Sequence, residues 1–413
     1  MKPINILIVE SGNGYGGSSS YLYSFLKFVN RNRFKPVVAV YYESDGPNIN
    51  NIRELGIKII FLNKRESKFM QFMFSFLKHY VWLKFITIVF YKDIPNFIKF
   101  VIIIKKQNIN LVLLNSEVHF NPAAVIAARF TNLPCVVRKS GVGDDDSKKL
   151  RIFLSKFVHH FIASSKAEEC FHLQNRWPCH KISTVYEGVD ISYFYPKAKS
   201  FNLHREIGIL PDSLLVGYIS RLDIGKGHDD FLKAARIVVN SLANVYFIIV
   251  GEDVRREEQS LKQSLLKLAR DLGIDRKVFF LGWRTDVREI LRDIDIFVHC
   301  PNTWKEGMGI ATLEAIASGK PAVVTRNWGL AETVNDGFNG YVAAIGNHGE
   351  IAARIMKLLL DDTLRQVMSK SSRVFAEEYF NIAKNVIKIE DILSQEAKYQ
   401  LKERNKKCIA DSH

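Results

Sequence analysis

Features that would assign the chain to several other protein classes are missing from its sequence. Its 413 residues include only five cysteines, and no two of them have C-x-x-C spacing. This odd, scattered set argues against a disulfide framework or a zinc site and fits a reducing compartment such as the cytosol. The N-terminal stretch MKPINILIVESGNG has no long apolar region and no small-residue cleavage site, so we expect no signal peptide.

An Asp-x-Asp pair at the end of a strand, which would indicate a metal site, is also missing. The run Asp144-Asp145-Asp146 falls in a predicted loop, where we expect it to be solvated or to face an acceptor. What the chain does have is the composition of a globular protein, with 47% hydrophobic and 24% charged residues. Its length is sufficient for two domains with complete cores.

Positive charge is unevenly distributed. The net charge is +15, and residues 1–190 hold 26 Lys and Arg against 14 Asp and Glu. Residues 62–106 hold nine basic residues against two acidic ones, together with many aromatic and aliphatic residues. Lysines in the middle of this stretch argue against a membrane span. Two alternatives remain: a helix lying at an anionic membrane surface, or a helix pair packed on the N-terminal sheet.

Strand-like and helical runs alternate along the whole chain, which is the βαβ pattern of doubly wound parallel sheets. The strand-like runs of the first half are INILIVE, VVAVYYE, KIIFL, INLVLLN and CVVRKS. Those of the second half are SLLVGYIS, VYFIIVGE, KVFFLGW, IDIFVHC and PAVVT. We expect two Rossmann-like α/β domains facing across a cleft, at residues 1–190 and 191–380, with a C-terminal helix and tail at 381–413. Ligands of such sheets bind at the carboxyl ends of the strands.

A glycine loop, GNGYGG, follows the first strand and precedes a helix. Gly12, Gly14 and Gly17 fit the G-x-G-x-x-G pattern of a dinucleotide site, with Glu43 in the ribose-binding position. This reading predicts an NAD-dependent oxidoreductase. Alternatively, Gly16 and Gly17 let the backbone approach a phosphate closely, or the loop is a tight turn only.

Two carboxylates lie eight residues apart in EGMGIATLE. Glu306 precedes a predicted helix and Glu314 lies within it, and the helix ends before Gly319 and Pro321. If all eight residues were helical, the two would be roughly 12 Å apart, too far to share one atom. They suit the two ends of a long ligand whose anionic middle lies on the free amides of the helix N-terminus.

Upstream, Arg221 and Lys226 lie in the glycine-flanked loop of SRLDIGKGHDD. Basic residues are most often surface charges. A loop that follows a strand, however, projects both toward the same cleft as Glu306. There they would stabilise a departing diphosphate, so we expect chemistry that needs no metal or other cofactor.

These segments together resemble the retaining GT-B glycosyltransferases of glycosyltransferase family 4. The resemblance rests on NGYGGSSSYL, VYEGVDISYF, ISRLDIGKGHDDFLKA, KEGMGIATLEAIASGKPAVVT and GLAETVNDGFNGYV, which occur in family order over nearly the whole chain. It implies transfer of a sugar from a nucleotide sugar to a hydroxyl of a glycan or lipid-linked acceptor. It also implies that the first domain binds the acceptor and that residues 381–407 form a helix crossing back onto it.

The resemblance assigns roles to individual residues. Glu306 would bind the donor sugar, Glu314 the ribose, and His119, in the loop NSEVHFNP, the transferred sugar. The remaining donor contacts would be the backbone at Gly16, Gly17, Gly307, Met308 and Gly309 for the phosphates, and Trp283 and Arg284 for the base. Glu187 replaces the asparagine usual in the family's NGVD segment, so any hydrogen bond donated by that amide would be lost.

We expect a cytoplasmic enzyme, with peripheral contact to the inner face of the plasma membrane if residues 62–106 bind lipid. A nucleic-acid-binding module is the weakest alternative, because the basic charge is concentrated in one aromatic stretch and no nucleic-acid motif is evident. The oxidoreductase alternative leaves the Glu306–Glu314 segment without a role.

Overall fold

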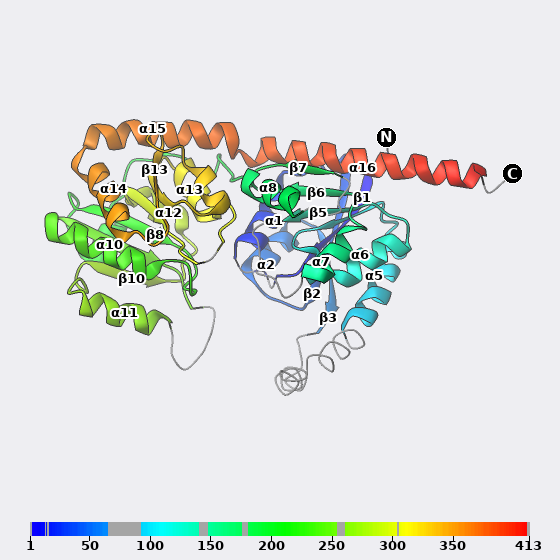
Figure 1. Ribbon diagram of the computed structural model, residues 1–413, viewed down its shortest axis with the longest axis horizontal. Helices are drawn as coiled ribbons and strands as arrows, with labels where there is room; N and C mark the ends of the chain where they lie inside the picture. Colours follow the sequence, from blue (N-terminus) through cyan, green and yellow to red (C-terminus); the bar gives the residue numbers. More distant parts are fainter. Residues whose placement is uncertain are drawn as a thin grey trace.

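The computed structural model describes residues 2–12, 14, 16–64, 92–139, 148–175, 181–253, 261–303 and 305–410. The acidic run Asp144-Asp145-Asp146 and residues 65–91 of the basic aromatic stretch lie outside the described residues. The chain forms two lobes, each built on one parallel sheet, and two consecutive long helices run across the same side of both (Figure 1).

The first lobe contains seven parallel strands in the order β3-β2-β1-β4-β5-β6-β7. They are β1 (Ile4–Glu10), β2 (Phe34–Tyr42), β3 (Lys58–Asn63), β4 (Leu111–Leu114), β5 (Cys135–Lys139), β6 (His160–Ala163) and β7 (Ile182–Thr184). The central strands β1 and β4 read as nearly continuous apolar runs because helices cover both faces of the sheet.

Helices of this lobe are α1 (Gly17–Phe28), α2 (Pro47–Glu54), α5 (Ile94–Lys106), η3 (Val118–Phe120), α6 (Pro122–Phe130), α7 (Lys148–Ser155) and α8 (Lys166–Gln174). Side chains of α1 and α2 pack with Ile6 and Ile8 on one face of β1. Those of α5 and α6 pack with Leu7 and Val9 on the other face. Alternate residues of one strand therefore belong to two separate hydrophobic clusters.

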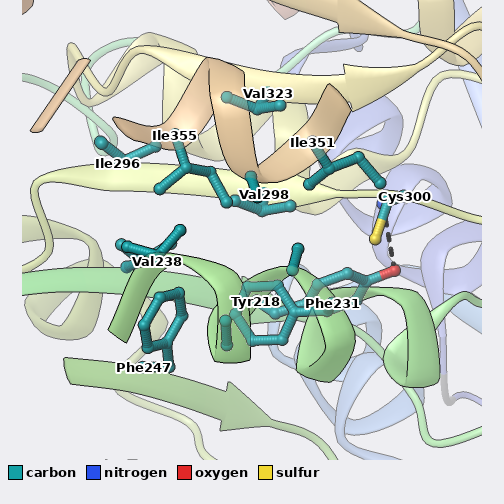
Figure 2. Packing of buried hydrophobic residues seen from close by; sticks show 14 of the residues in the cluster. Tyr218, Phe231, Val238, Phe247, Ile296, Val298, Cys300, Val323, Ile351 and Ile355 are labelled. Atoms are coloured by element: carbon teal, nitrogen blue, oxygen red, sulfur yellow. Dashed lines mark hydrogen bonds between the residues drawn. The ribbon is translucent and has the colours of Figure 1, made fainter. Parts of the chain in front are cut away.

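The second lobe contains six parallel strands in the order β10-β9-β8-β11-β12-β13. They are β8 (Leu214–Ile219), β9 (Val245–Val250), β10 (Val278–Gly282), β11 (Ile296–His299), β12 (Ala322–Thr325) and β13 (Gly340–Ala343). Its helices are α9 (Asn202–Ile207), α10 (His228–Ser241), α11 (Leu261–Asp271), α12 (Val287–Asp293), α13 (Ile310–Ala317), η4 (Trp328–Thr333) and α14 (His348–Leu360). Figure 2 shows part of the core between this sheet and helices α10 and α14.

Two long helices follow, α15 (Asp362–Tyr379) on the second lobe and α16 (Ile382–Ala410) on the first (Figure 1). The apolar face of α16 packs into the same cluster as α1, through Ile382, Val386 and Ile389. Where the chain passes between the lobes, the backbone of Val189 bonds to that of Phe380 and Ile382. The two passages of the chain thus lie side by side.

Both sheets reverse their strand order at a comparable place, between β1 and β4 in the first and between β8 and β11 in the second. Ligands of doubly wound sheets bind beyond the carboxyl ends of the strands at such a reversal. The predicted fold of two doubly wound parallel sheets is confirmed. Among the described residues, no helix combines the length and the apolar character needed to cross a membrane.

Candidate active site

Four loops that carry predicted catalytic or donor-binding residues leave strands at the two reversals. The glycine loop follows β1 and the His119 segment follows β4, while Arg221 and Lys226 follow β8 and Glu306 follows β11. The two lobes meet at these loops, since a Cβ built on Gly17 would lie 3.4 Å from Cγ1 of Ile310, the first residue of α13. The structure therefore places the glycine loop opposite the start of the helix that carries Glu314.

Lys226 and Glu306 form an ion pair between Nζ and Oε2. Lys226 is only 7% exposed, although its sequence gave no indication of burial. Burial alone would raise the pKa of Glu306, but the positive charge of Lys226, with smaller contributions from His299 and Arg221, lowers it below its usual value. Glu306 is therefore ionised, and the three predicted residues Arg221, Lys226 and Glu306 share one site.

The loop that carries Lys226 is held by close backbone packing against β11. Gly227 has φ +78°, and a Cβ there would lie 1.8 Å from the carbonyl oxygen of Cys300. The hydroxyl of Tyr218 donates to the carbonyl of Lys226 and accepts from the amide of Cys300 at 3.3 Å. The thiol of Cys300 donates to the carbonyl of Gly227 at 3.3 Å. The dashed line at Cys300 in Figure 2 is the bond from its amide to the Tyr218 hydroxyl. Only glycine fits at position 227.

Glu306 is positioned by a second loop, the one after β12. Its amide donates to Oδ1 of Asn327 at 2.9 Å, and Nδ2 of Asn327 donates to the carbonyl of Pro301 at 3.3 Å. Below this loop lies His299, with Nδ1 3.0 Å from Oγ1 of Thr312 and Nε2 3.9 Å from Oε2 of Glu306. The sequence indicated no role for Asn327 or His299, although each lies at or just after the end of a strand.

The backbone between the two carboxylates turns at Gly309 and leads directly into α13. Gly309 precedes α13 with φ +64°. The imidazole ring of His299 packs against it and leaves no room for a side chain at this position. Met308 is fully buried, with its side chain in the hydrophobic core of the second lobe. The amides at Gly307, Met308 and Gly309 thus lead into a helix N-terminus, where unpaired N–H groups favour an anion.

Glu314 lies on α13 and is partly buried. Burial raises its pKa to about 8, and no described residue forms an ion pair or hydrogen bond with its carboxylate in the structure. A carboxyl group withdrawn from water without a donor is costly. Hydroxyl groups of a ligand would provide such donors, as the predicted ribose contact requires.

His119 lies in η3, directly after β4 and Glu117. Its Nδ1 is 2.9 Å from Oε2 of Glu117, which is also 3.2 Å from Nη1 of the buried Arg151. The ring packs on Phe120 with 4.0 Å between ring centres. His119 is thus held at the carboxyl edge of the first sheet, on the first lobe's side of the cleft.

The two residues predicted to contact the base differ in their surroundings. Trp283 follows β10 and is 56% exposed. Arg284 forms ion pairs with Asp286, 2.6 Å between Nη2 and Oδ2, and with Glu206 of α9, 2.5 Å between Nη1 and Oε1. These hydrogen bonds raise the pKa of Arg284. Contact between Arg284 and the nucleotide base stays a prediction. Such a contact would have to form while Arg284 is paired with Asp286 and Glu206.

A buried polar network that the sequence did not reveal supports the glycine loop. Arg138 of β5 donates to Oε1 of Glu187 at 2.9 Å and to Oδ1 of Asn115 at 3.2 Å, and it lies over the ring of Tyr21. Asn115 donates to Glu10 at 2.5 Å, and Glu10 accepts the amide of the loop's first glycine at 2.7 Å. Glu187 is therefore an ion-pair partner of Arg138 and not merely a residue in a turn.

Contacts outside the cleft also join the lobes. Glu332 of η4 accepts the first two amides of α8, at 2.9 Å from Lys166 and 2.7 Å from Ala167. The rings of Phe171 and Trp328 pack edge to face. In the described part of the chain, no cluster of three or more His, Cys, Asp or Glu side chains is placed to hold a metal ion.

Comparison with known proteins identifies the class of enzyme. Residues 200–375 match the family described as glycosyl transferases group 1. The chain is a glycosyltransferase. Its match to the group 1 family spans the lobe that contains Arg221, Lys226, Glu306 and Glu314.

Two relatives align with most of this glycosyltransferase. A UDP-Gal:alpha-D-GlcNAc-diphosphoundecaprenol alpha-1,3-galactosyltransferase of Escherichia coli is 28% identical over 73% of this chain and 79% of its own. An N,N'-diacetylbacillosaminyl-diphospho-undecaprenol alpha-1,3-N-acetylgalactosaminyltransferase of Campylobacter jejuni is 28% identical over 69% of this chain and 78% of its own. Neither comparison supports the oxidoreductase alternative.

The glycosyltransferase has the GT-B fold. The solved structure of HepE from Anabaena in complex with UDP-glucose superposes on it with a TM-score of 0.78. The match covers 95% of this chain and all of the HepE chain, at 21% sequence identity. At that identity the similarity concerns the fold, with two parallel-sheet domains facing each other.

Proposed function

We propose that this glycosyltransferase transfers a sugar, with retention of anomeric configuration, from a nucleoside diphosphate sugar to a hydroxyl of a glycan or lipid-linked acceptor. The observation that carries the proposal is the ion pair of Lys226 and Glu306 at the edge where the lobes meet. A cation for the leaving group and a carboxylate for sugar hydroxyls lie within contact of each other, beside a helix N-terminus. The resemblance to family 4 supports retention.

The names of the relatives support the two substrate classes. The Escherichia coli relative is named for UDP-Gal as donor. Both relatives are named for acceptors carried on a diphospho-undecaprenol lipid. HepE was solved with UDP-glucose bound.

In this proposal the donor lies along the second lobe. Arg221 and Lys226 bind the diphosphate together with the amides at the start of α13, and Glu306 accepts hydrogen bonds from the sugar. Glu314 accepts hydrogen bonds from the ribose, and these donors would favour its ionised form, which burial disfavours. His119 contacts the transferred sugar from the first lobe.

Transfer then proceeds on one face of the sugar. The bond between the anomeric carbon and the diphosphate oxygen breaks, and its electron pair stays with the diphosphate. The acceptor oxygen bonds to the anomeric carbon on the same face, and the hydroxyl proton passes to the leaving phosphate oxygen. Because negative charge grows on the diphosphate, preorganised cations lower the barrier, and we propose that Arg221 and Lys226 do so without a metal ion.

An open cavity of about 280 Å³ on the first lobe supports an acceptor site beside His119. It is lined by Ser11, Tyr41, Tyr42, Lys92 and Phe120. Aromatic walls suit the apolar faces of a sugar, and a lysine suits an acceptor phosphate. The buried hydroxyl of Tyr41 has no hydrogen-bond partner among the described residues and is a further donor for such a ligand.

We also propose peripheral contact with an anionic membrane on the inner face of the plasma membrane. Helix α5 exposes Ile94, Ile98 and Ile102 at four-residue spacing, with 42% to 56% of each side chain accessible. Lys105 and Lys106 end the same helix. An apolar stripe beside lysines is the arrangement of a helix that rests on anionic lipid, and it would bring the cavity near a lipid-linked acceptor.

A panel of nucleotide sugars, tested with purified protein, checks the proposal. We expect UDP or another nucleoside diphosphate, and not NAD, to raise the melting temperature. The product should keep the donor's anomeric configuration in its proton NMR spectrum, and EDTA should leave the rate unchanged. Stabilisation by NAD alone would contradict the proposed donor class, an inverted product would contradict retention, and loss of rate in EDTA would contradict metal independence.

A further inference from the structure

His299 is the last residue of β11, and it is fixed in the floor of the donor site. It is only 3% exposed. A Cβ on Gly309 would lie 2.9 Å from its ring, so the ring packs directly under the turn that begins α13. On another side it packs edge to face with Tyr218 at 5.6 Å between ring centres. The imidazole therefore has little freedom to turn.

The two ring nitrogens of His299 differ in their partners. Nδ1 lies 3.0 Å from the hydroxyl oxygen of Thr312. Nε2 points toward Glu306, 3.9 Å from Oε2, and it is buried with no hydrogen bond in the described part of the chain. A buried ring nitrogen that has no partner is unusual in folded proteins. This one lies about 1 Å beyond hydrogen-bond distance from a carboxylate.

We propose that His299 is a positioning residue that receives Glu306 when a donor diphosphate takes Lys226, an inference that rests on the proposed function. In the structure, Lys226 is paired with Oε2 of Glu306. A diphosphate carries more negative charge than one carboxylate and competes for that lysine. The freed oxygen would be left without a partner, and the Nε2–H of His299 is the neighbouring donor.

The consequence is a defined place for the carboxylate during the reaction. With one oxygen held by His299, the other is aimed at the donor sugar. Lys226 is then fully available to the departing diphosphate. His299 remains uncharged in this role, because its pKa is lowered to about 4, chiefly by burial, with Glu306 raising it and Lys226 lowering it to smaller extents. The neutral ring accepts from Thr312 at Nδ1 and donates from Nε2.

Two substitutions separate this role from simple packing. The amide nitrogen of His299→Gln reaches the position of Nε2, whereas that of His299→Asn reaches only the position of Nδ1. With UDP as the probe in isothermal titration calorimetry, we expect Gln to bind within about threefold of wild type. We expect Asn to bind about 10- to 100-fold more weakly, because a hydrogen bond to a charged group is lost.

The same Asn substitution in a Glu306→Gln background provides the control. There the carboxylate is absent, so adding His299→Asn should change UDP affinity by less than about threefold. Equal losses in the Gln and Asn variants, or an Asn effect that is undiminished in the Glu306→Gln background, would overturn the inference in favour of packing alone.

A measurement on the unmutated chain does not depend on how the variants fold. In protein labelled with 15N-histidine, the Nε2-bound proton of His299 should move downfield when UDP is added, as its hydrogen bond to the carboxylate forms. UDP binding without that shift would overturn the role of His299 and leave the proposed function standing. Failure of the wild-type protein to bind UDP in titrations would instead count against the proposed donor.

Discussion

The two lobes differ in how completely the polar side chains near the cleft are paired. In the first lobe, Arg138 and Glu187 are buried and already paired, within a network that ends at the glycine loop. In the second lobe, Lys226 and Glu306 are paired, but Glu314 and one ring nitrogen of His299 have no hydrogen-bond partner among the described residues. The first lobe's network supports a loop, whereas the proposed function assigns the unpaired groups of the second lobe to ligand binding.

This contrast predicts that substitutions in the first lobe's network mainly reduce stability, and substitutions in the second lobe mainly reduce activity or binding. The largest effect should come from Lys226→Ala. Losing a preorganised cation at a departing diphosphate should lower kcat by about 10²- to 10³-fold. Turnover of a nucleotide sugar measures it.

Lys233→Ala is the matched control for that substitution. Lys233 lies on α10 of the same lobe and pairs with Asp229 at 3.1 Å on the surface. It should keep wild-type kcat. If Lys226→Ala were as active as Lys233→Ala while showing a normal circular dichroism spectrum, the assignment of Lys226 to catalysis would be wrong.

The next effect concerns the first lobe. Arg138→Met leaves Glu187 buried without its partner and should lower the free energy of unfolding by about 3–5 kcal/mol, as measured in urea. Lys27→Met breaks a pair with Asp190 in which the lysine is 41% exposed, and it should cost no more than about 1 kcal/mol. Similar losses in the two variants would show that the Arg138 network is not a stabilising unit.

A smaller effect should appear in the pH dependence of donor binding. The free enzyme's Glu314 has a pKa raised to about 8, and ribose hydroxyls that donate to its carboxylate should lower that pKa in the complex. Binding then releases a proton below pH 8, so affinity is greatest above pH 8 and declines as pH falls. At pH 7 the loss should be about tenfold.

Calorimetry with UDP between pH 7 and 9, in buffers of different ionisation enthalpy, measures both the affinity and the released proton. Glu314→Gln cannot titrate and should show a flat profile. A sloping profile in this variant, equal to that of the wild type, would assign the proton to another group.

The smallest effect tests the proposed membrane face. Ile98→Asp on α5 should reduce co-sedimentation with phosphatidylglycerol vesicles by about three- to tenfold at low salt, because it places a negative charge in the apolar stripe. Val367 on α15 is similarly exposed, at 55%, but lies on the second lobe. Val367→Asp should sediment like wild type, and equal behaviour of the two variants would contradict the proposed orientation.

Local patterns were sufficient to predict most of the fold. The run INILIVE coincides with β1, and the segment PAAVIAARF coincides with α6. Both were predictable because an apolar strand and a helix that begins with proline can be recognised from consecutive residues. The relation of Glu306 to α13 was also predictable, since glycines separate that residue from the helix.

Long-range partners could not be predicted in the same way. Lys226 and Glu306 are 80 residues apart, and Arg138 and Glu187 are 49 residues apart. The hydrophobic periodicity of the sequence does not indicate which strand ends become neighbours, because the order of strands in the sheet determines that. The burial of Lys226 and the position of His299 depend on that order, which is why both emerged only from the structure.

The side-by-side passages of the chain at Val189 and Ile382 have a mechanical consequence. A Cβ on Gly188 would lie 2.5 Å from the Cα of Ile382, so the two connections touch at one point. One lobe can rotate against the other about that contact without stretching either connection. Cleft opening then requires the contacts between the lobes to separate, among them the cap formed by Glu332 on α8, the neighbouring ring contact and the packing of Ile310 against the first lobe. Admission of a bulky donor and release of the spent nucleotide would thus proceed by a swing of whole lobes, with both sheets unchanged.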